Sequence, residues 1–267
     1  MKATFVTAAL TALLSIAAVA GAQEIVTLPT RDGVTQSFLL TVPSGDKPAA
    51  AAILLPGGQG LIRLSNEGGR IRLGEANFLV RTRQLFVERG VAAAVVDSPS
   101  DQPQGMDDWF RLSDKHVTDM RRVADDLTRR FPGTPVFLVG TSRGTVSAAA
   151  AGRVLGETIA GVVLTSTLFV GGRRAGPGLS GFDFTSVRAP VLFVHHADDG
   201  CRSTPYRNAK NLSAQFALIT VNGGDPARSD PCEPFSAHGF LGKEPETVEP
   251  MVNWMLKKPY RTNIDGS

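Results

Sequence analysis

The 267-residue sequence has few of the residues that usually hold metal ions. It contains two cysteines and four histidines, and these show neither Cys-x-x-Cys nor His-Glu-x-x-His spacing. It also has no internal repeat and no block of one charge, since basic and acidic residues are interleaved around a formal net charge of +3. A nucleic-acid-binding protein usually shows a basic patch. We therefore expect no metal ion, no other cofactor and no nucleic-acid partner.

A single apolar run approaches the length of a membrane span, and it lies at the N-terminus. Lys2 precedes an apolar stretch over residues 5–20, which ends in the small residues Ala20-Gly21-Ala22. This arrangement is typical of a secretory signal peptide, because the stretch is short for an uncleaved anchor and no stop-transfer charges follow it. We predict a signal peptide over residues 1–22, secretion or export to the periplasm, and no membrane association of the mature chain, residues 23–267.

The mature chain alternates short apolar runs with helix-like stretches. The apolar runs are continuous, which is typical of strands buried on both faces of a parallel sheet. They cover residues 50–55, 91–96, 136–139, 160–164, 190–194 and 216–221. The helix-like stretches cover residues 76–89, 114–130, 143–155, 204–214 and 245–257, the last weakened by Pro250. The alternation predicts one α/β domain with helices on both faces of its sheet.

A β-hairpin is expected before the first of these runs. Residues 24–30 and 35–42 have strand composition, and the turn signal Arg31-Asp32-Gly33 joins them. This hairpin would form an antiparallel edge of the sheet. In α/β sheets, binding and catalytic residues lie beyond the carboxyl ends of the parallel strands. The residues that follow each apolar run are therefore the candidates for a site.

Residues 140–144, Gly-Thr-Ser-Arg-Gly, match G-x-S-x-G between a strand and a small-residue helix. Side chains at the two glycine positions would collide with neighbouring backbone. Such a turn would lift Ser142 Oγ out of the sheet and direct the Arg143 N–H and the helix N-terminus toward the same point. We predict Ser142 as a nucleophile, with a tight turn that carries no chemistry as the alternative.

A serine hydroxyl needs a base to accept its proton and a third group to orient that base. Of the four histidines, only His238 follows every candidate acid, as the chain order Ser, acid, His requires. It lies in a loop that can reach back over the sheet. His116 falls within an amphipathic helix, where we expect a surface or flanking position, and His195 and His196 end a strand.

With these residues, the sequence resembles the α/β-hydrolase superfamily over nearly all of the mature chain. The resemblance rests on the residues at 55–60 (LPGGQG), 140–144 (GTSRG), 195–199 (HHADD) and 237–240 (AHGF). It is nearest to compact esterases with little cap, of the dienelactone-hydrolase-like and cutinase-like kinds. It implies an α/β-hydrolase fold, with a mostly parallel, eight-stranded sheet and a Ser-His-acid triad. Because the connection over 168–189 is too short for a cap domain, we expect an open site.

The resemblance assigns further residues. The family's acid follows the seventh strand, which places it at Asp199, with Asp198 as the alternative. One oxyanion donor would be the N–H of Arg143, after the nucleophile. The other would come from the glycine loop after residues 50–55, as the N–H of Gly58 or, second, of Gln59. This loop lacks the Gly-Lys-Ser/Thr ending of a phosphate-binding loop.

Residues 195–201 concentrate two histidines, two aspartates and a cysteine. A metal site would need both His195 and His196, but adjacent strand residues point to opposite faces. Two cysteines in an exported chain instead favour a disulfide between Cys201 and Cys232, with two free thiols as the alternative. It would tie the acid loop to the histidine loop and stabilise the fold by about 3–4 kcal/mol.

Together these observations predict an exported serine hydrolase, a carboxylesterase in the first instance, acting on a small-molecule ester. An amidase, peptidase or thioesterase with the same triad is an alternative, and so is a non-catalytic binding protein of the same fold. Trp109 and Phe110, in the connection over residues 97–113, would either line the pocket or pack that connection onto the body. A monomer is consistent with the sequence.

Overall fold

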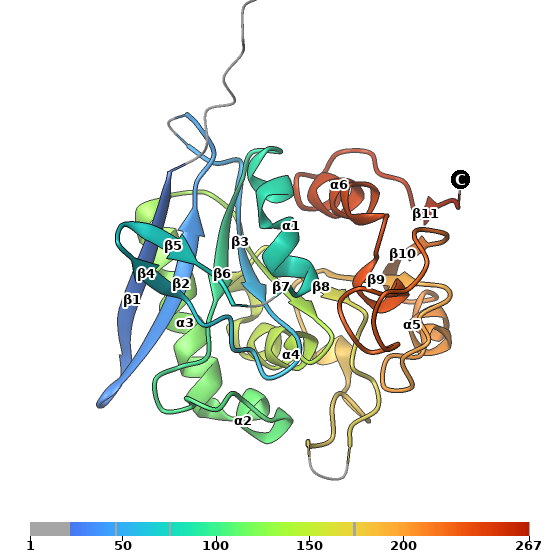
Figure 1. Cartoon of the computed structure of the whole chain (residues 1–267), viewed down its shortest axis with the longest axis horizontal. Helices are drawn as coiled ribbons and strands as arrows, with labels where there is room; N and C mark the ends of the chain where they lie inside the picture. Colours follow the sequence, from blue (N-terminus) through green and yellow to red (C-terminus); the bar gives the residue numbers. More distant parts are fainter. Residues whose placement is uncertain (1–21, 46, 75, 173–174, 267) are drawn as a thin grey trace, which may run out of the picture.

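A nine-stranded sheet forms the centre of the molecule (Figure 1). The computed structural model describes residues 22–45, 47–74, 76–172 and 175–266, so the predicted signal peptide lies outside the described residues except for Ala22. The sheet order is β1-β2-β6-β3-β7-β8-β9-β10-β11. The strands are β1 (Gln23–Arg31), β2 (Val34–Thr41), β3 (Ala50–Leu55), β6 (Val91–Val96), β7 (Val136–Thr141), β8 (Gly161–Thr165), β9 (Val191–His196), β10 (Ala217–Val221) and β11 (Asn263–Ile264).

The strand pairing confirms a mostly parallel sheet. β2 runs antiparallel to β1 and β6, which confirms the hairpin, and every other neighbouring pair in this sheet is parallel. Five of the six continuous apolar runs form β3, β6, β7, β8 and β9, whose residues are all buried. The sixth forms β10, whose first two residues are only half-buried. The eight predicted strands are present, and the two-residue β11 adds a ninth because residues near the C-terminus pair with β10.

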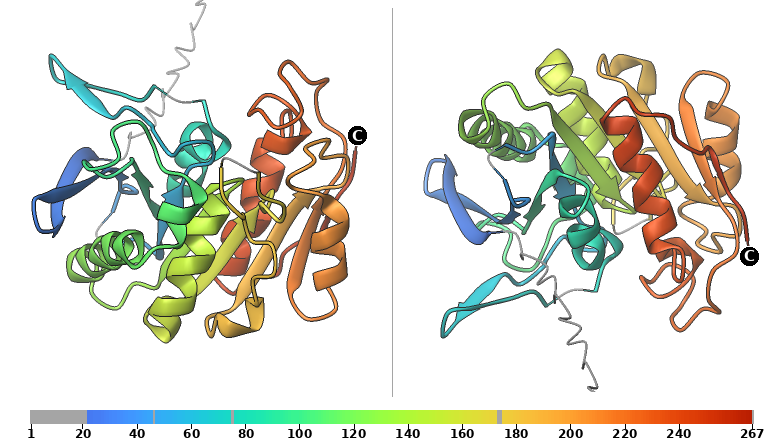
Figure 2. Two further views of the ribbon diagram at one scale, coloured as in Figure 1. Left: turned by 90° about the horizontal axis from the view of Figure 1, so that it is seen from below. Right: turned by 90° about the horizontal axis from the view of Figure 1, so that it is seen from above.

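Helices cover both faces of the sheet, as Figure 2 shows in two views along its layers. The helices α1 (Phe78–Val87) and α6 (Glu244–Met255) contribute to one apolar core, and α3 (Asp114–Arg130), α4 (Gly144–Leu155) and α5 (Tyr206–Leu212) contribute to the other. α6 continues through Pro250 because the flanking Val248, Met251 and Val252 are buried against the sheet, and this packing outweighs one lost hydrogen bond.

Three short elements were not expected from the sequence. They are the hairpin of β4 (Ser65–Glu67) and β5 (Arg70–Arg72), the one-turn helix α2 (Asp108–Leu112) and β11. The connection from β8 to β9 carries only a short 3-10 turn, Phe184–Ser186, among its described residues, so no cap domain is inserted there. None of the described helices has the length and apolarity needed to cross a membrane.

Candidate active site

Ser142 lies in the sharp turn between β7 and α4, with a backbone φ of 52°. This left-handed conformation is strained for a residue that has a side chain, and such strain concentrates at functional sites. The flanking glycines make the turn feasible. A Cβ on Gly140 would overlap the carbonyl oxygen of Gly144, and a Cβ on Gly144 would overlap the carbonyl oxygen of Leu55. The predicted G-x-S-x-G turn is therefore present, and the two glycines that flank the serine lie in close contact with neighbouring backbone.

His238 and Asp199 form a buried pair. The Nδ1 atom of His238 lies 3.0 Å from Oδ2 of Asp199, and their side chains are 5 % and 0 % exposed. Asp198, one residue earlier, is exposed. Of the two candidate acids, Asp199 is thus the one that contacts the histidine. A proton on Nδ1 is shared with the carboxylate, which leaves Nε2 of a neutral imidazole free to accept another.

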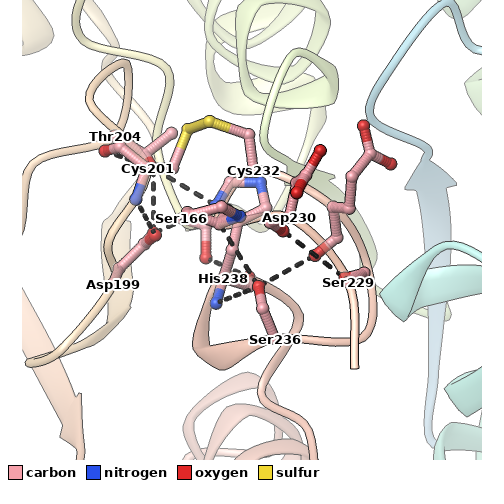
Figure 3. The surroundings of a disulfide bond; sticks show 11 residues. Ser166, Asp199, Cys201, Thr204, Ser229, Asp230, Cys232, Ser236 and His238 are labelled. Carbon is pink, nitrogen blue, oxygen red and sulfur yellow. Dashed lines mark hydrogen bonds and ion pairs between the residues drawn. A yellow bond between two sulfur atoms is a disulfide. The ribbon is translucent and has the colours of Figure 1, made fainter. Parts of the chain in front are cut away.

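Thr204 is a third member of this cluster and was not identified in the sequence. Its Oγ1 donates to Oδ2 of Asp199 at 2.8 Å and lies 3.2 Å from Nδ1 of His238. The other carboxylate oxygen, Oδ1, accepts the backbone N–H of Cys201 at 3.0 Å. Figure 3 shows Asp199, Thr204 and His238 gathered beside the disulfide. Two donors besides the histidine therefore fix the orientation of the carboxylate.

The histidine loop is held at three points. Ser166 Oγ donates to the carbonyl oxygen of His238 at 2.8 Å, and the N–H of His238 donates to Ser236 Oγ at 3.2 Å. Arg81, which forms a 3.0 Å ion pair with Glu244, donates to the next carbonyl, that of Gly239, at 2.5 Å. Ser166 follows the end of β8, whereas Arg81 and its partner Glu244 belong to α1 and α6, so the loop is held by the end of a central strand and by two helices of one face of the sheet.

The predicted disulfide is present between Cys201 and Cys232, whose Cα atoms are 4.6 Å apart. Both cysteines line the same cavity, of about 540 Å³, as Ser142 and His238. The bond therefore ties the acid loop to the histidine loop, as expected, and also forms part of the cavity wall.

The remaining histidines lie outside this pair. Burial lowers the pKa of His195 to about 3, and its Nε2 accepts the N–H of Thr167 at 2.9 Å. His196 instead contacts the Gly223 carbonyl through Nε2 at 2.7 Å. His116 was expected at the surface or flanking its helix, but it is fully buried because α2 packs against α3. Burial also lowers the pKa of His116 to about 3.

The glycine loop after β3 faces the same cavity as Ser142. Gly58 has a φ of 55°, and the Gly60 N–H donates to the carbonyl of Gly57 at 3.0 Å, which closes a tight turn. Gly58, Gln59 and Arg143 line the cavity. Within the described part of the chain, the backbone N–H groups of these three residues donate to no other protein atom. All three N–H groups are thus available to a bound oxygen.

Trp109 and Phe110 do not line this cavity. Trp109 is 64 % exposed on α2, whereas the Phe110 ring lies 5.7 Å from the guanidinium carbon of Arg31 and 5.7 Å from the His116 ring. Phe110 therefore packs its connection onto the body of the protein, which is the second of the two roles considered from the sequence.

The backbone is similar to those of several solved structures. It superimposes on Est1E from Butyrivibrio proteoclasticus with a TM-score of 0.61 and 16 % identity, over 87 % of this chain and 98 % of that one. A cold-adapted esterase from an Arctic intertidal metagenomic library gives a TM-score of 0.60 and 16 % identity, with 90 % and 95 % covered. An α/β serine hydrolase without lid from Xanthomonas campestris gives a TM-score of 0.56 and 14 % identity, over 85 % of this chain and 94 % of that one.

No family model matches the sequence, and a comparison with curated proteins finds no related sequence. The likeness therefore lies in the fold. The central sheet, its helices on both faces and the lack of an inserted cap domain in the described residues are those of an α/β-hydrolase fold, as the sequence motifs predicted.

Proposed function

We propose that this chain, which has the α/β-hydrolase fold, is an exported serine hydrolase that cleaves carboxylic esters through an acyl-enzyme. One observation carries the proposal. A histidine that contacts a buried carboxylate at 3.0 Å shares a cavity with a serine held on a strained turn. The description of structural neighbours as esterases supports an ester as the substrate.

In the proposed acylation, His238 Nε2 accepts the proton of Ser142 as Oγ bonds to the ester carbonyl carbon. The carbonyl π electrons move to oxygen, and the N–H groups of Arg143 and of Gly58 or Gln59 stabilise this oxyanion. Asp199 stabilises the imidazolium without taking its proton. Collapse of the intermediate breaks the bond to the alcohol oxygen, which leaves with the proton from His238.

Deacylation repeats these steps with water in place of the serine. His238 takes a proton from water as its oxygen attacks the acyl carbon, and the same N–H groups stabilise the second oxyanion. Ser142 then leaves with the proton and the carboxylic acid is released. These steps balance without any cofactor, because one water supplies the OH that the acid gains and restores to Ser142 the proton that the alcohol took.

A non-catalytic binding protein of this fold is the rival from another class. A fluorophosphonate probe discriminates between the two, because it phosphonylates only a serine that a base activates. We expect stoichiometric labelling at Ser142 in the folded protein and none in Ser142→Ala. An unlabelled wild-type protein with native unfolding behaviour would support the binding protein instead.

An amidase, peptidase or thioesterase could use the same residues. Turnover of p-nitrophenyl esters of increasing acyl length, measured beside matched p-nitroanilides and thioesters, separates these activities. We expect the esters to give the highest kcat/KM, and the series of acyl lengths then reports the chain length that the cavity accepts. A higher kcat/KM for an anilide or a thioester would reassign the substrate class.

The proposed export rests on the N-terminal sequence and on the disulfide, since such bonds persist in oxidising compartments. Mass spectrometry of the protein recovered from the periplasm or medium tests it. We expect a mature chain that begins at Gln23 and is two mass units lighter than its reduced form. Retention of Met1 in the cell body would contradict export.

A further inference from the structure

Two charged residues of α2 lie buried behind the segments that carry the proposed oxyanion donors. Asp108 and Arg111 are 0 % and 1 % exposed. They lie on one turn of helix, and they contact different segments: Arg111 reaches the glycine loop after β3, and Asp108 reaches the residue after Ser142. α2 thus contacts two backbone segments that are far apart in the sequence, follow the paired strands β3 and β7 and line the same cavity.

Arg111 is bound by neutral oxygen atoms alone. Its Nη1 donates to Ser147 Oγ at 2.8 Å, and its Nη2 donates to the carbonyls of Gly58 at 3.2 Å and Pro56 at 3.5 Å. Among the described residues, no carboxylate lies within ion-pair distance of it. Burial lowers the pKa of Arg111 to about 9, so it is still charged at neutral pH.

Burying a cation without a carboxylate partner costs desolvation free energy, whereas burying an apolar side chain of similar volume does not. Stability of the fold therefore does not explain Arg111. Its hydrogen bonds do, because two of the three acceptors are carbonyls of the loop that carries Gly58 and Gln59. The loop is also shaped around it: a Cβ on Gly60 would lie 2.7 Å from Nη2 of Arg111.

The contact with the Gly58 carbonyl sets the direction of a candidate oxyanion donor. The Gly58 C=O and the Gln59 N–H belong to one planar trans peptide group and point in opposite directions. By binding the oxygen, Arg111 fixes and polarises the N–H at the other end. The preceding peptide, with the Gly58 N–H, is fixed by the bond from Gly60 to Gly57. Without Arg111, the peptide group between Gly58 and Gln59 could rotate easily, because glycine at position 58 restricts its backbone little.

Asp108 acts on the other candidate donor. Its Oδ1 accepts Nε of Arg143 at 2.9 Å, and its Oδ2 accepts the N–H of Gly178 at 3.0 Å. Arg143 is the residue whose N–H follows the nucleophile, and its side chain also donates to the Ala175 carbonyl at 3.0 Å. A Cβ on Gly176 would lie 2.5 Å from Cβ of Asp108, so glycine makes room for this carboxylate too.

We infer that Asp108 and Arg111 are positioning residues of the oxyanion hole, and that α2 holds its two donor segments at a fixed separation. This inference rests on the proposed function, in which Arg143 and Gly58 or Gln59 bind the oxyanion. Neither α2 residue touches the substrate. Arg111 acts through the Gly58 carbonyl and Asp108 through the side chain of Arg143, so their loss weakens binding of the transition state and leaves binding of the ester itself largely unchanged.

The test compares Arg111→Lys, Arg111→Met and Asp108→Asn with the wild type and with Asp119→Asn. Asp119 is a matched control because it is also fully buried and paired with an arginine, Arg31, at 2.9 Å, but it lies away from the cavity. For each protein, kcat and KM are measured with a p-nitrophenyl ester, and Ki with a trifluoromethyl ketone, which forms a tetrahedral oxyanion on the serine. Thermal unfolding reports stability.

We expect the three α2 variants to lose about tenfold to a hundredfold in kcat, and to bind the ketone weaker by the same factor, with KM within about twofold. We expect Asp119→Asn to lose stability and keep its kcat. If Arg111→Met fails to fold, Arg111→Lys and Asp108→Asn decide the question, because each retains part of the original hydrogen bonding.

Two outcomes would overturn the inference alone: folded α2 variants with wild-type kcat and ketone affinity, or an equal loss of kcat in Asp119→Asn, which would indicate general destabilisation. In both, the wild type still turns over ester and is labelled by fluorophosphonate at Ser142. A folded wild type that shows neither turnover nor labelling would instead overturn the proposed function, and this inference with it.

Discussion

The backbone N–H of Cys201 donates a hydrogen bond to Oδ1 of Asp199 at 3.0 Å. The same cysteine is bonded to Cys232, six residues before His238. The disulfide is therefore joined to the acid by one hydrogen bond and to the histidine by a short length of chain. A change in this bond should alter both the stability of the fold and the geometry of the proposed catalytic pair.

Replacing both cysteines, as in Cys201→Ser/Cys232→Ser, should lower the free energy of unfolding by about 3–4 kcal/mol, because the bond closes a loop with a sequence separation of 31. It should also lower kcat, because the loop after β10 is then free to move relative to Asp199. Denaturant unfolding and ester turnover check the two effects. Wild-type protein reduced with dithiothreitol is the control and should match the variant. Unchanged stability and turnover would refute the idea.

The two adjacent aspartates should behave differently. Asp199→Asn removes the carboxylate that contacts His238, and we expect kcat to fall by about 10⁴-fold, since the amide favours the wrong histidine tautomer. Asp198→Asn is the matched control, because the Asp198 side chain is exposed, and it should keep kcat within about twofold. Steady-state kinetics with one ester is sufficient. A larger loss in Asp198→Asn than in Asp199→Asn would reverse the assignment.

Gly144 should not tolerate a side chain. Its added Cβ would overlap the carbonyl oxygen of Leu55, which is main chain of a central strand and cannot move aside, so Gly144→Ala should lose about 1–3 kcal/mol of stability or fail to fold. Gly172→Ala provides the control, since among the described residues its Cβ would meet only Ala175 Cβ, at 3.8 Å. Its unfolding midpoint should match the wild type. Equal midpoints for the two variants would argue against a close-packed turn.

Two buried histidines should make the fold sensitive to acid. Burial lowers the pKa of His116 to about 3, whereas in the unfolded chain it titrates near 6.5. The unfolded state therefore binds more protons below pH 6.5, and stability is lost progressively as the pH falls from about 6.5 to 3, by at most about 1.4 kcal/mol per pH unit for each histidine. Burial lowers the pKa of His195 in the same direction, so His195 adds to this loss of stability at low pH.

His116→Leu isolates one of the two contributions, because it removes a titrating group that does not line the cavity. Urea unfolding of this variant and of the wild type at several pH values between 4 and 7 should give a shallower dependence for the variant. Above pH 7 the free energies of unfolding of the two proteins should change with pH in the same way, because the histidine is neutral in both the folded and the unfolded state. Parallel curves across the whole range would show that His116 is protonated equally in the folded and unfolded chains.

The parts of the fold that follow from local pattern could be predicted. Each buried strand is a continuous apolar run, and the helix predicted over 114–130 has the same bounds in the structure. The β4–β5 hairpin could not be predicted, because its residues are polar and mostly exposed and therefore show no periodicity. β11 has two residues and exists only through its pairing with β10.

The candidate site divides in the same way. Ser142 and His238, which line one cavity, could be proposed from the sequence because a motif and the chain order single them out. Thr204, Ser166 and Arg111 could not, because Thr204 and Ser166 contact His238 and Arg111 contacts Gly58 across long sequence separations, and nothing near a single threonine, serine or arginine signals such a contact. His116 was misjudged for a similar reason, since the helix that covers it, α2, is too short to show a pattern.

The disulfide in the cavity wall also determines how the protein must be made. A chain synthesised in a reducing cytosol keeps its cysteines as thiols, yet it has the apolar strands and glycines needed to assemble the sheet and the turn at Ser142. We expect such a preparation to be folded by circular dichroism but low in specific activity. Thiol titration of each batch would then report its active fraction, and oxidative refolding would recover the remainder.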